Sequence, residues 1–354
     1  MEFGIAVATT TDSWKVVKRA EELGFSDAWF YDTQMLNPDV FIGMALAAVH
    51  TSKIGLGTGV LIPSNRIAPV AANALASINK LAPGRVKFGV GTGFTGRRTM
   101  GQTAIKLKDM ERYVNDVQGL LAGDIVYWDS EGKEHPIQFL NPDLGLINIE
   151  DEIPLYISAF GNKSRKLTAS MNAGWLNFGG SPDDALKSIG EMQLEWEASG
   201  NNKSELNSTL FTLGCVLKQG EPATSERALA QAGPLAAVGY HALVEGFASD
   251  MIGEIFPPER VAQIEAYRKI YELYQPEDAR YLQLHRGHLM FNRPEEMPFL
   301  TEELILGSTF TGSREMLIEQ IRRLDEGGYS QFTIQIVQGQ EDAIEDWVDV
   351  FAGV

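Results

Sequence analysis

Short apolar segments alternate with helical segments along most of this chain, and this alternation restricts the possible folds more than any other feature of the sequence. Four such pairs can be traced in the first 122 residues, with expected strands at 3–8, 27–31, 54–62 and 86–91. After a connection that contains a small hairpin at 127–139, three more strands are expected at 154–158, 175–178 and 209–217. Continuous apolar strands separated by helices are typical of a parallel sheet that helices cover.

The final segment decides between an open sheet and a closed barrel. A helix is expected to begin at 311–313 and to end before the pair Gly327-Gly328, and an eighth strand follows at 331–337. Eight strands favour a (β/α)8 TIM barrel over an open doubly wound sheet. The rhythm is lost only at about 233–300, where two helical patterns, 235–251 and 258–274, precede a loop rich in His, Arg and Pro. The sequence therefore predicts a single α/β domain, 1–354, with a helical and loop insertion between strands 7 and 8.

Charge and cysteine content argue against several classes of function. The formal net charge of −17 disfavours a nucleic acid or an anionic membrane as a partner, because binding a polyanion requires a concentrated positive surface. The single cysteine, Cys215, excludes an intramolecular disulfide and a multi-cysteine metal site. The first residues show no basic leader, and no run of about 18 apolar residues occurs. A soluble, cytoplasmic protein is expected.

The carboxyl ends of the expected strands are rich in glycine and small polar residues, and active sites of such barrels lie at these ends. Strand 3 ends in Gly57-Thr58-Gly59, and strand 4 ends in the segment GVGTG at 89–93. These glycines either let a planar ring or a phosphate approach the backbone, or they serve only the tight packing of helix on strand. The sequence leaves both interpretations open.

The ends of strands 5 and 6 favour an anion. Strand 6 runs into the segment GGS at 179–181, directly before a helix that begins at Pro182. Free amides and the helix dipole make such an end attractive to negative charge. Strand 5 is followed by the segment SAFGNKSR at 158–165, whose cations either face the same site or form a solvated first helical turn. A phosphate is expected on this side of the barrel.

Three segments of the chain resemble the bacterial-luciferase-like superfamily. They are LGTGVLIP at 56–63, LAPGRVKFGVG at 81–91 and the turn SAFGNK at 158–163. The resemblance extends over nearly the whole chain and includes an insertion after the seventh strand. It implies a flavin-type oxidoreductase, because the superfamily contains monooxygenases that use reduced FMN and hydride-transfer enzymes that use the deazaflavin coenzyme F420.

The resemblance also implies where a cofactor binds. In the superfamily the flavin ring rests on a bulge at the end of the third strand, often with a non-prolyl cis peptide, which corresponds to Thr58 and its two successors. The phosphate site corresponds to the glycines that follow strands 5 and 6, and a polar position beside the ring corresponds to Thr92. The implied cofactor-binding residues are Thr58, Gly59, Val60, Thr92, Ser158, Gly161, Gly179, Gly180 and Ser181.

The chain departs from the superfamily at the end of strand 2. Many relatives carry Asp-His there, whereas this chain carries Asp32 followed by Thr33 and Gln34, which become catalytic candidates at that position. The acid and base role is otherwise expected at His288, and less so at His285, because an imidazole titrates near neutrality and the insertion covers the barrel mouth. No histidine pair has helical metal-ligand spacing with a nearby acid, so no metal is expected.

The primary functional hypothesis is an FMN-dependent monooxygenase that uses reduced FMN and O2 on a small organic substrate. A separate flavin reductase would supply the reduced flavin, since no dinucleotide fingerprint is present. The first alternative is hydride transfer with coenzyme F420, whose acidic tail the net charge mildly disfavours. The second alternative is a flavin-binding barrel without catalysis. Loop cations Arg66, Arg97 and Arg98 either bind substrate or cofactor anions or form ion pairs, and a homodimer is implied by the resemblance.

Overall fold

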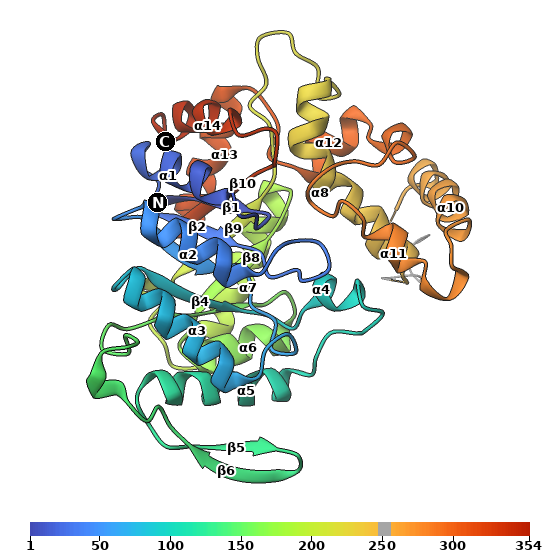
Figure 1. The fold of residues 1–354 in the computed structure, drawn as a ribbon. Helices are drawn as coiled ribbons and strands as arrows, with labels where there is room; N and C mark the ends of the chain where they lie inside the picture. The colour runs from blue at the N-terminus through green and yellow to red at the C-terminus, as the bar shows by residue number, and fades with distance from the viewer. Residues whose placement is uncertain (247–255) are drawn as a thin grey trace.

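In the computed structural model, which describes residues 1–246 and 256–354, eight parallel strands close into a barrel (Figure 1). The order around the barrel is β1-β10-β9-β8-β7-β4-β3-β2. Closure is visible at β1, where Val7 pairs with Phe30 of β2 on one side and Ile336 of β10 on the other. The predicted TIM barrel is confirmed. Its strands are β1 (Glu2–Val7), β2 (Asp27–Phe30), β3 (Gly55–Thr58), β4 (Val86–Val90), β7 (Leu155–Ser158), β8 (Gly174–Phe178), β9 (Ser208–Thr212) and β10 (Gln331–Ile336).

Helices cover the outside of the barrel, and most begin and end close to the expected residues. A short additional helix, α4 (Phe94–Arg98), begins at Gly93, whose positive φ of 77° turns the chain away from β4. Within the described ranges no helix is both long and apolar enough to cross a membrane. The other helices of the outer layer are α1 (Ser13–Glu22), α2 (Val40–His50), α3 (Ala68–Leu81), α5 (Leu107–Leu121), α6 (Asn162–Ser170), α7 (Pro182–Ala198), α13 (Arg314–Gly327) and α14 (Ala343–Phe351).

The expected hairpin stands apart from the barrel, at the bottom of Figure 1. It consists of β5 (Val126–Ser130) and β6 (Lys133–Ile137), which pair antiparallel. The two turn residues Glu131 and Gly132 both have positive φ angles, of 54° and 76°. Positive φ at both central residues is the backbone of a type I′ turn, which suits the twist of a two-residue hairpin.

Aromatic side chains fill the barrel interior. The Trp29 ring packs edge-to-face against Tyr156 and Phe211, with ring centroids 5.2 and 5.5 Å apart. A Cβ atom added at Gly57 would lie only 2.3 Å from the Trp29 ring, so this glycine of strand β3 is required by packing. Side chains therefore fill the interior of the barrel. Of the three aromatic residues, Phe211 also lines the pocket at the carboxyl ends of the strands.

The insertion begins with one continuous helix, α8 (Glu226–Val244), which starts before the helical pattern that was expected from 235. Gly233 and the buried Pro234 look like a helix break in the sequence. In the structure a Cβ at Gly233 would lie 2.4 Å from the Asn292 amide, and the Asn292 Nδ2 donates a hydrogen bond of 2.7 Å to the Leu229 carbonyl. The glycine thus makes room for a tertiary contact and does not end the helix. The expected residues 247–251 of the second pattern lie outside the described ranges.

The chain pairs with itself where it leaves and re-enters the barrel. Val216 and Gly312 form a parallel bridge, and the Phe310 amide donates to the Leu213 carbonyl. The insertion therefore starts earlier and ends later than the expected 233–300, although it lies between the seventh and eighth strands as predicted. Figure 1 shows its elements as a lobe beside the barrel. After α8 they are α10 (Pro258–Glu272), α11 (Tyr281–Leu284) and α12 (Glu302–Ser308).

Arg227 anchors the start of the insertion to the barrel. Its guanidinium pairs with Glu221 and with Asp346 of α14, the latter at 3.0 Å, and donates 2.7 Å to the Val216 carbonyl. The hydrogen bond from Arg227 lowers the pKa of Glu221 from its ordinary value of 4.5 to about 2. This contribution to stability is therefore complete above about pH 4.5 and disappears as the pH falls toward 2.

The Glu221→Gln substitution is expected to lower the free energy of unfolding by about 1 kcal/mol at pH 7, because it removes the charge of this partly screened pair. The loss should shrink as the pH falls from 4.5 toward 2, where the wild-type carboxyl also becomes neutral. Urea unfolding at several pH values measures it, with the exposed Glu111→Gln of α5 as control. A loss that is equal at all pH values would show that the ion pair does not stabilise the fold.

Candidate active site

Strand β3 ends in a bulge at Gly59 and Val60. The peptide bond between these two residues is cis, as the resemblance implied. Thr58 fixes the bulge to β4, because its hydroxyl donates to the Gly89 carbonyl (2.7 Å) and accepts from the Gly89 amide (3.0 Å). The ladder resumes at Leu61, whose amide donates to the same carbonyl (2.8 Å). The Thr58 side chain is thus buried between strands, and Gly59 and Val60 are the residues that the bulge presents to the barrel mouth.

A pocket of about 70 Å³ opens at the carboxyl ends of the barrel strands, above the Trp29 layer. Sites for whole cofactors measure about 300–1,000 Å³, so this pocket is large enough only for the edge of a planar ring. A Cβ at Gly91 would lie 2.7 Å from the Val60 side chain and 3.4 Å from Ser158, so Gly91 leaves the room that these two residues occupy. The residues that line the pocket are Tyr31, Gly59, Val60, Ser158, Leu176, Asn177, Phe178 and Phe211.

Six of the predicted cofactor residues do not line this pocket: Thr58, Thr92, Gly161, Gly179, Gly180 and Ser181. Thr92 is half-buried beyond the end of β4, and its carbonyl accepts the Ile105 amide. The Gly179 amide donates to the Phe211 carbonyl (3.0 Å), so the ladder has already used this donor. A Cβ at Gly180 would lie 1.8 Å from the Ser308 carbonyl oxygen. Close packing against the end of α12 therefore explains the glycine at 180 without a phosphate.

The two helix ends that the sequence marked for an anion differ in charge. At α7, Ser181 caps the helix by accepting the Asp184 amide (3.2 Å), and Asp183 and Asp184 place two carboxylates in the first turn. At α6, the first turn contains no acidic residue and begins with Gly161, Asn162 and Lys163. Since carboxylates at α7 repel an anion that the dipole would attract, the α6 end is the better anion site.

The catalytic candidates at the end of β2 hold loops together. Gln34 donates to the Gly96 carbonyl (3.0 Å) and accepts from Asn65 (2.8 Å), and the Thr33 hydroxyl donates to Asn37. Neither residue lines the pocket.

The neighbouring Asp32 is buried and pairs with Arg66 at 2.9 Å. The other loop arginines are also engaged: Arg98 pairs with Glu245, and Arg97 donates to the Thr103 carbonyl (2.6 Å). The sequence left open whether these arginines bind substrate or cofactor anions or form ion pairs. In the structure they contact other groups of the protein.

His288, the main acid and base candidate, lies in the insertion beside His241 and His285, with ring centroids 6.4 and 6.0 Å away. It does not line the pocket, and the next residue, Leu289, belongs to the apolar cluster against which Tyr31 of the pocket packs. Burial and the two neighbouring imidazoles lower the pKa of His288 well below its ordinary value. The ring is therefore neutral at physiological pH.

Tyr31 is one of five pocket residues that sequence reasoning missed; the others are Leu176, Asn177, Phe178 and Phe211. Its hydroxyl donates to the Gln335 side chain (2.9 Å), and the Gln335 amide donates to the Leu289 carbonyl (2.5 Å). Burial raises the pKa of Tyr31, so the phenol stays protonated. Its position one residue after strand β2 was the available signal, because the carboxyl ends of all barrel strands converge at the mouth.

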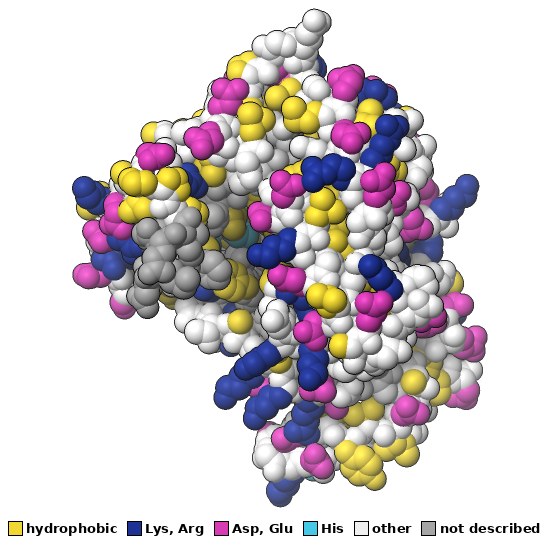
Figure 2. Space-filling view, turned by 180° about the vertical axis from the view of Figure 1, so that it is seen from behind, with side chains coloured by type: hydrophobic (Ala, Val, Ile, Leu, Met, Phe, Trp, Pro, Cys, Tyr) yellow, Lys and Arg dark blue, Asp and Glu magenta, His cyan; other side chains and the backbone are white. Residues whose placement is uncertain are grey.

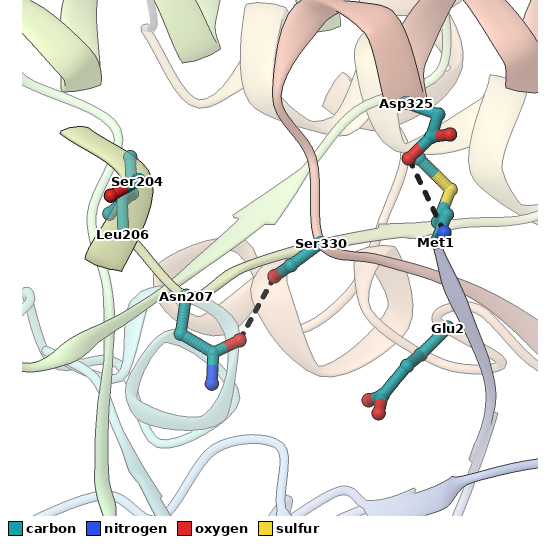
Figure 3. A pocket seen from close by; sticks show the side chains of 7 residues that line it. All are labelled: Met1, Glu2, Ser204, Leu206, Asn207, Asp325 and Ser330. Atoms are coloured by element: carbon teal, nitrogen blue, oxygen red, sulfur yellow. Dashed lines mark hydrogen bonds and ion pairs between the residues drawn. The ribbon is translucent and has the colours of Figure 1, made fainter.

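A larger cavity of about 520 Å³ lies at the opposite, amino-terminal end of the strands (Figure 3). Its polar groups bind one another: the amino terminus of Met1 pairs with Asp325 at 3.4 Å, and Ser330 donates to Asn207 at 2.9 Å. This end of a barrel serves stability, whereas catalysis takes place at the carboxyl end. The smaller pocket is therefore the candidate active site.

The fold and the pocket define a (β/α)8 barrel enzyme with its site at the carboxyl ends of the strands. A model of the luciferase-like monooxygenase family matches residues 6–331, and the chain belongs to this family. It is accordingly a flavin-type oxidoreductase, as the sequence predicted.

Sequence relatives add detail. The chain is 26% identical over 232 residues to a 5,10-methylenetetrahydromethanopterin reductase of Methanolobus tindarius, covering 64% of the chain and 68% of the relative. It is 32% identical over 190 residues to the reductase of the same name from Archaeoglobus fulgidus, covering 52% and 55%. It is 25% identical to an F420-dependent glucose-6-phosphate dehydrogenase of Kineococcus radiotolerans, covering 54% and 60%. The alignments thus span between about half and two thirds of these relatives.

Solved structures agree on the fold. The F420-dependent tetrahydromethanopterin reductase of Methanopyrus kandleri superposes with a TM-score of 0.68 at 19% identity, covering 99% of this chain and 97% of that chain. The monooxygenase RslO1 of Streptomyces bottropensis superposes with a TM-score of 0.62 at 15% identity, covering 99% of each chain. At such identities the likeness concerns the fold and does not distinguish the two chemistries.

Proposed function

We propose that this protein is a hydride-transfer oxidoreductase that uses the deazaflavin coenzyme F420 and acts on a small organic molecule. The character of the sequence relatives carries the proposal: they are reductases and dehydrogenases, and the one from Kineococcus radiotolerans is F420-dependent. F420-dependent hydride transfer, the first alternative expected from the sequence, thus takes the place of FMN-dependent monooxygenation as the main hypothesis.

The mouth of the barrel fits a deazaflavin ring. Such a ring, when bound, supplies hydride transfer and reacts poorly with oxygen. The bulge at Gly59 and Val60 offers an open backbone surface against which a planar ring packs, and Leu176 and Phe178 give the pocket apolar walls that exclude water. The Ser158 hydroxyl is the polar group on the side of β7. These residues bind and orient the ring, which is most of what a protein contributes to cofactor chemistry.

A basic rim beside the pocket suits the anionic part of the coenzyme. We use this name for Lys106 and Lys108 at the start of α5 and Lys163 and Lys166 at the start of α6, all of which are exposed. The two helices follow β4 and β7, which are neighbours in the barrel. Figure 2 shows several Lys and Arg side chains close together in the lower part of one face, with Asp and Glu side chains between them, although the chain carries a net charge of −17. Local charge decides binding at short range, so the net charge is a weak argument against an acidic tail.

Monooxygenation with reduced FMN is the second candidate, because the family carries the name of that activity. Only this route requires a separate flavin reductase. The two routes differ in oxygen: a monooxygenase consumes O2 together with its substrate, and a strict hydride transferase does not. A homodimer formed through the outer helices stays a prediction.

Reversing charge in the basic rim tests the proposal. The double substitution Lys163→Glu and Lys166→Glu is expected to weaken F420 binding at least about tenfold at low salt and less at high salt, because salt screens exposed charges. Binding of the deazaflavin riboside, which lacks phosphate and tail, should change little.

The matched control reverses Lys187 and Lys203, which are equally exposed but lie away from the start of α6. Fluorescence titration measures all three affinities. If both double variants bind F420 equally, the acidic tail does not use the basic rim.

A further inference from the structure

Three of the five histidines of this chain come together outside the candidate active site. His241 is on α8, and His285 and His288 follow α11, more than forty residues later in the chain. One ring nitrogen from each lies within 4.8 Å of the others. The ring centroids form a nearly equilateral triangle with sides of 6.0, 6.2 and 6.4 Å.

Each of the three rings has a free nitrogen. The Nδ1 atoms of His241, His285 and His288 are all buried, and none has a hydrogen-bond partner among the described residues. Two of the side chains, those of His241 and His285, are 4% exposed. Leaving three buried polar atoms unpaired in one place is costly for a folded protein, and each such group calls for a partner.

The opposite nitrogens of two rings bind carboxylates. His241 Nε2 lies 2.6 Å from Glu296 Oε1, and His285 Nε2 lies 2.9 Å from Glu245 Oε1. A carboxylate that accepts the second N–H of a histidine fixes its tautomer, so that the other nitrogen presents a lone pair, and this arrangement is typical of metal-binding histidines. In His241 and His285 the carboxylate therefore leaves the lone pair on Nδ1.

The carboxylates are themselves held in place. Arg293 donates 2.5 Å to Glu296, Tyr267 donates 3.1 Å to the same oxygen, and Glu296 is 2% exposed. The Arg293 amide also donates to the other carboxylate oxygen of Glu296 (2.7 Å). The Glu296 carboxylate is therefore fixed beside His241.

We propose that His241, His285 and His288 bind a divalent transition-metal ion of the zinc type, with a fourth position left for water or another ligand. Three imidazole nitrogens, two of them on rings whose other nitrogen binds a carboxylate, match the ligand preference of zinc. A tetrahedral zinc site holds its nitrogens about 3.4 Å apart, whereas these lie within 4.8 Å of one another, so the rings need to approach by up to about 1.4 Å. This inference does not depend on which flavin coenzyme the enzyme uses.

The ion would connect the insertion to the barrel mouth. It joins α8 to the segment that carries His288, and Leu289 in that segment accepts a hydrogen bond from Gln335, which also binds Tyr31 of the pocket. Metal binding therefore stabilises the contact of Leu289 with Gln335 and Tyr31, and we expect the melting temperature of the protein to rise when the metal is added.

The test uses the full-length protein after treatment with a chelator. Isothermal titration with Zn²⁺ is expected to show one site with a Kd of about 1 µM or lower, and Co²⁺ is expected to give the visible bands of a low-symmetry site with nitrogen ligands. The His288→Gln variant should weaken Zn²⁺ binding at least about a hundredfold, because it removes one of three ligands. The control is His135→Gln in the exposed hairpin, which should bind as the wild type does.

The Co²⁺ spectrum requires no variant and keeps the test decisive if His288→Gln fails to fold. Absence of saturable Zn²⁺ binding, a Co²⁺ spectrum of the hydrated ion, or equal affinity of the two variants would each overturn the proposal. In that case the three histidines form a hydrogen-bonded network that water completes.

Discussion

Ser158→Trp is expected to abolish coenzyme binding while the protein stays folded. Ser158 ends strand β7 at the pocket wall, opposite Val60, and its Cβ lies 3.4 Å from the position of a Cβ at Gly91. An indole there fills a pocket of only about 70 Å³ and excludes the edge of the ring. We expect affinity for F420 to fall at least about a hundredfold, which corresponds to about 2.7 kcal/mol. Fluorescence titration measures the affinity.

The matched control is Ser170→Trp at the carboxyl end of α6, an exposed position away from the mouth. It should bind F420 as the wild type does, and both variants should keep the wild-type melting temperature within a few degrees. Undiminished binding by Ser158→Trp would place the ring elsewhere and would remove this pocket as the active site.

The second large effect concerns stability. Gly180→Ala is expected to lower the free energy of unfolding by about 3 kcal/mol or more, because its Cβ would lie 1.8 Å from the Ser308 carbonyl oxygen and backbone must move to admit it. The matched control is Gly190→Ala within α7, where nothing lies within 4 Å of the added Cβ. That change should stabilise the protein by up to about 1 kcal/mol, since alanine is the better helix former. Urea denaturation measures both.

This pair of variants also separates the two roles that the sequence left open for Gly180. If Gly180→Ala keeps its stability but loses coenzyme affinity, the glycine serves a phosphate, and the α7 end is the anion site after all. If stability falls, packing against α12 explains it.

Much of the fold could be predicted because local signals agree with the tertiary structure. Each strand is a short apolar run bounded by turn residues, so the eight-stranded barrel followed from counting them. The bulge at Gly59 and Val60 was accessible through the resemblance, which carries information that periodicity alone lacks. The hairpin turn at Glu131 and Gly132 was also marked by its residue types.

The features that sequence reasoning missed depend on contacts between distant segments. Gly233 is typical of a helix end, but in the structure it lies within a helix, where the absence of a side chain allows Asn292 to pack against it. The α7 end is a different case, because Asp183 and Asp184, the acids that disfavour an anion there, follow Ser181 closely and were visible in the sequence.

The histidine cluster is the clearest such case. The sequence predicted no metal site, because no histidine pair has helical metal-ligand spacing with a nearby acid, and His241 lies far in sequence from His285 and His288. Only the packing of α8 against the segment after α11 brings the three rings together. Ligands that come from different helices leave no periodic signal in a single sequence.

The most direct test of the central claim is a comparison of F420 and FMN binding to the purified protein under anaerobic conditions, with both coenzymes in oxidised and reduced form. We expect saturable binding of F420 with an affinity at least about tenfold higher than that of either form of FMN, and loss of this preference in the Ser158→Trp variant. Tighter binding of reduced FMN, with F420 bound weakly or not at all, would contradict the proposal and restore the monooxygenase hypothesis.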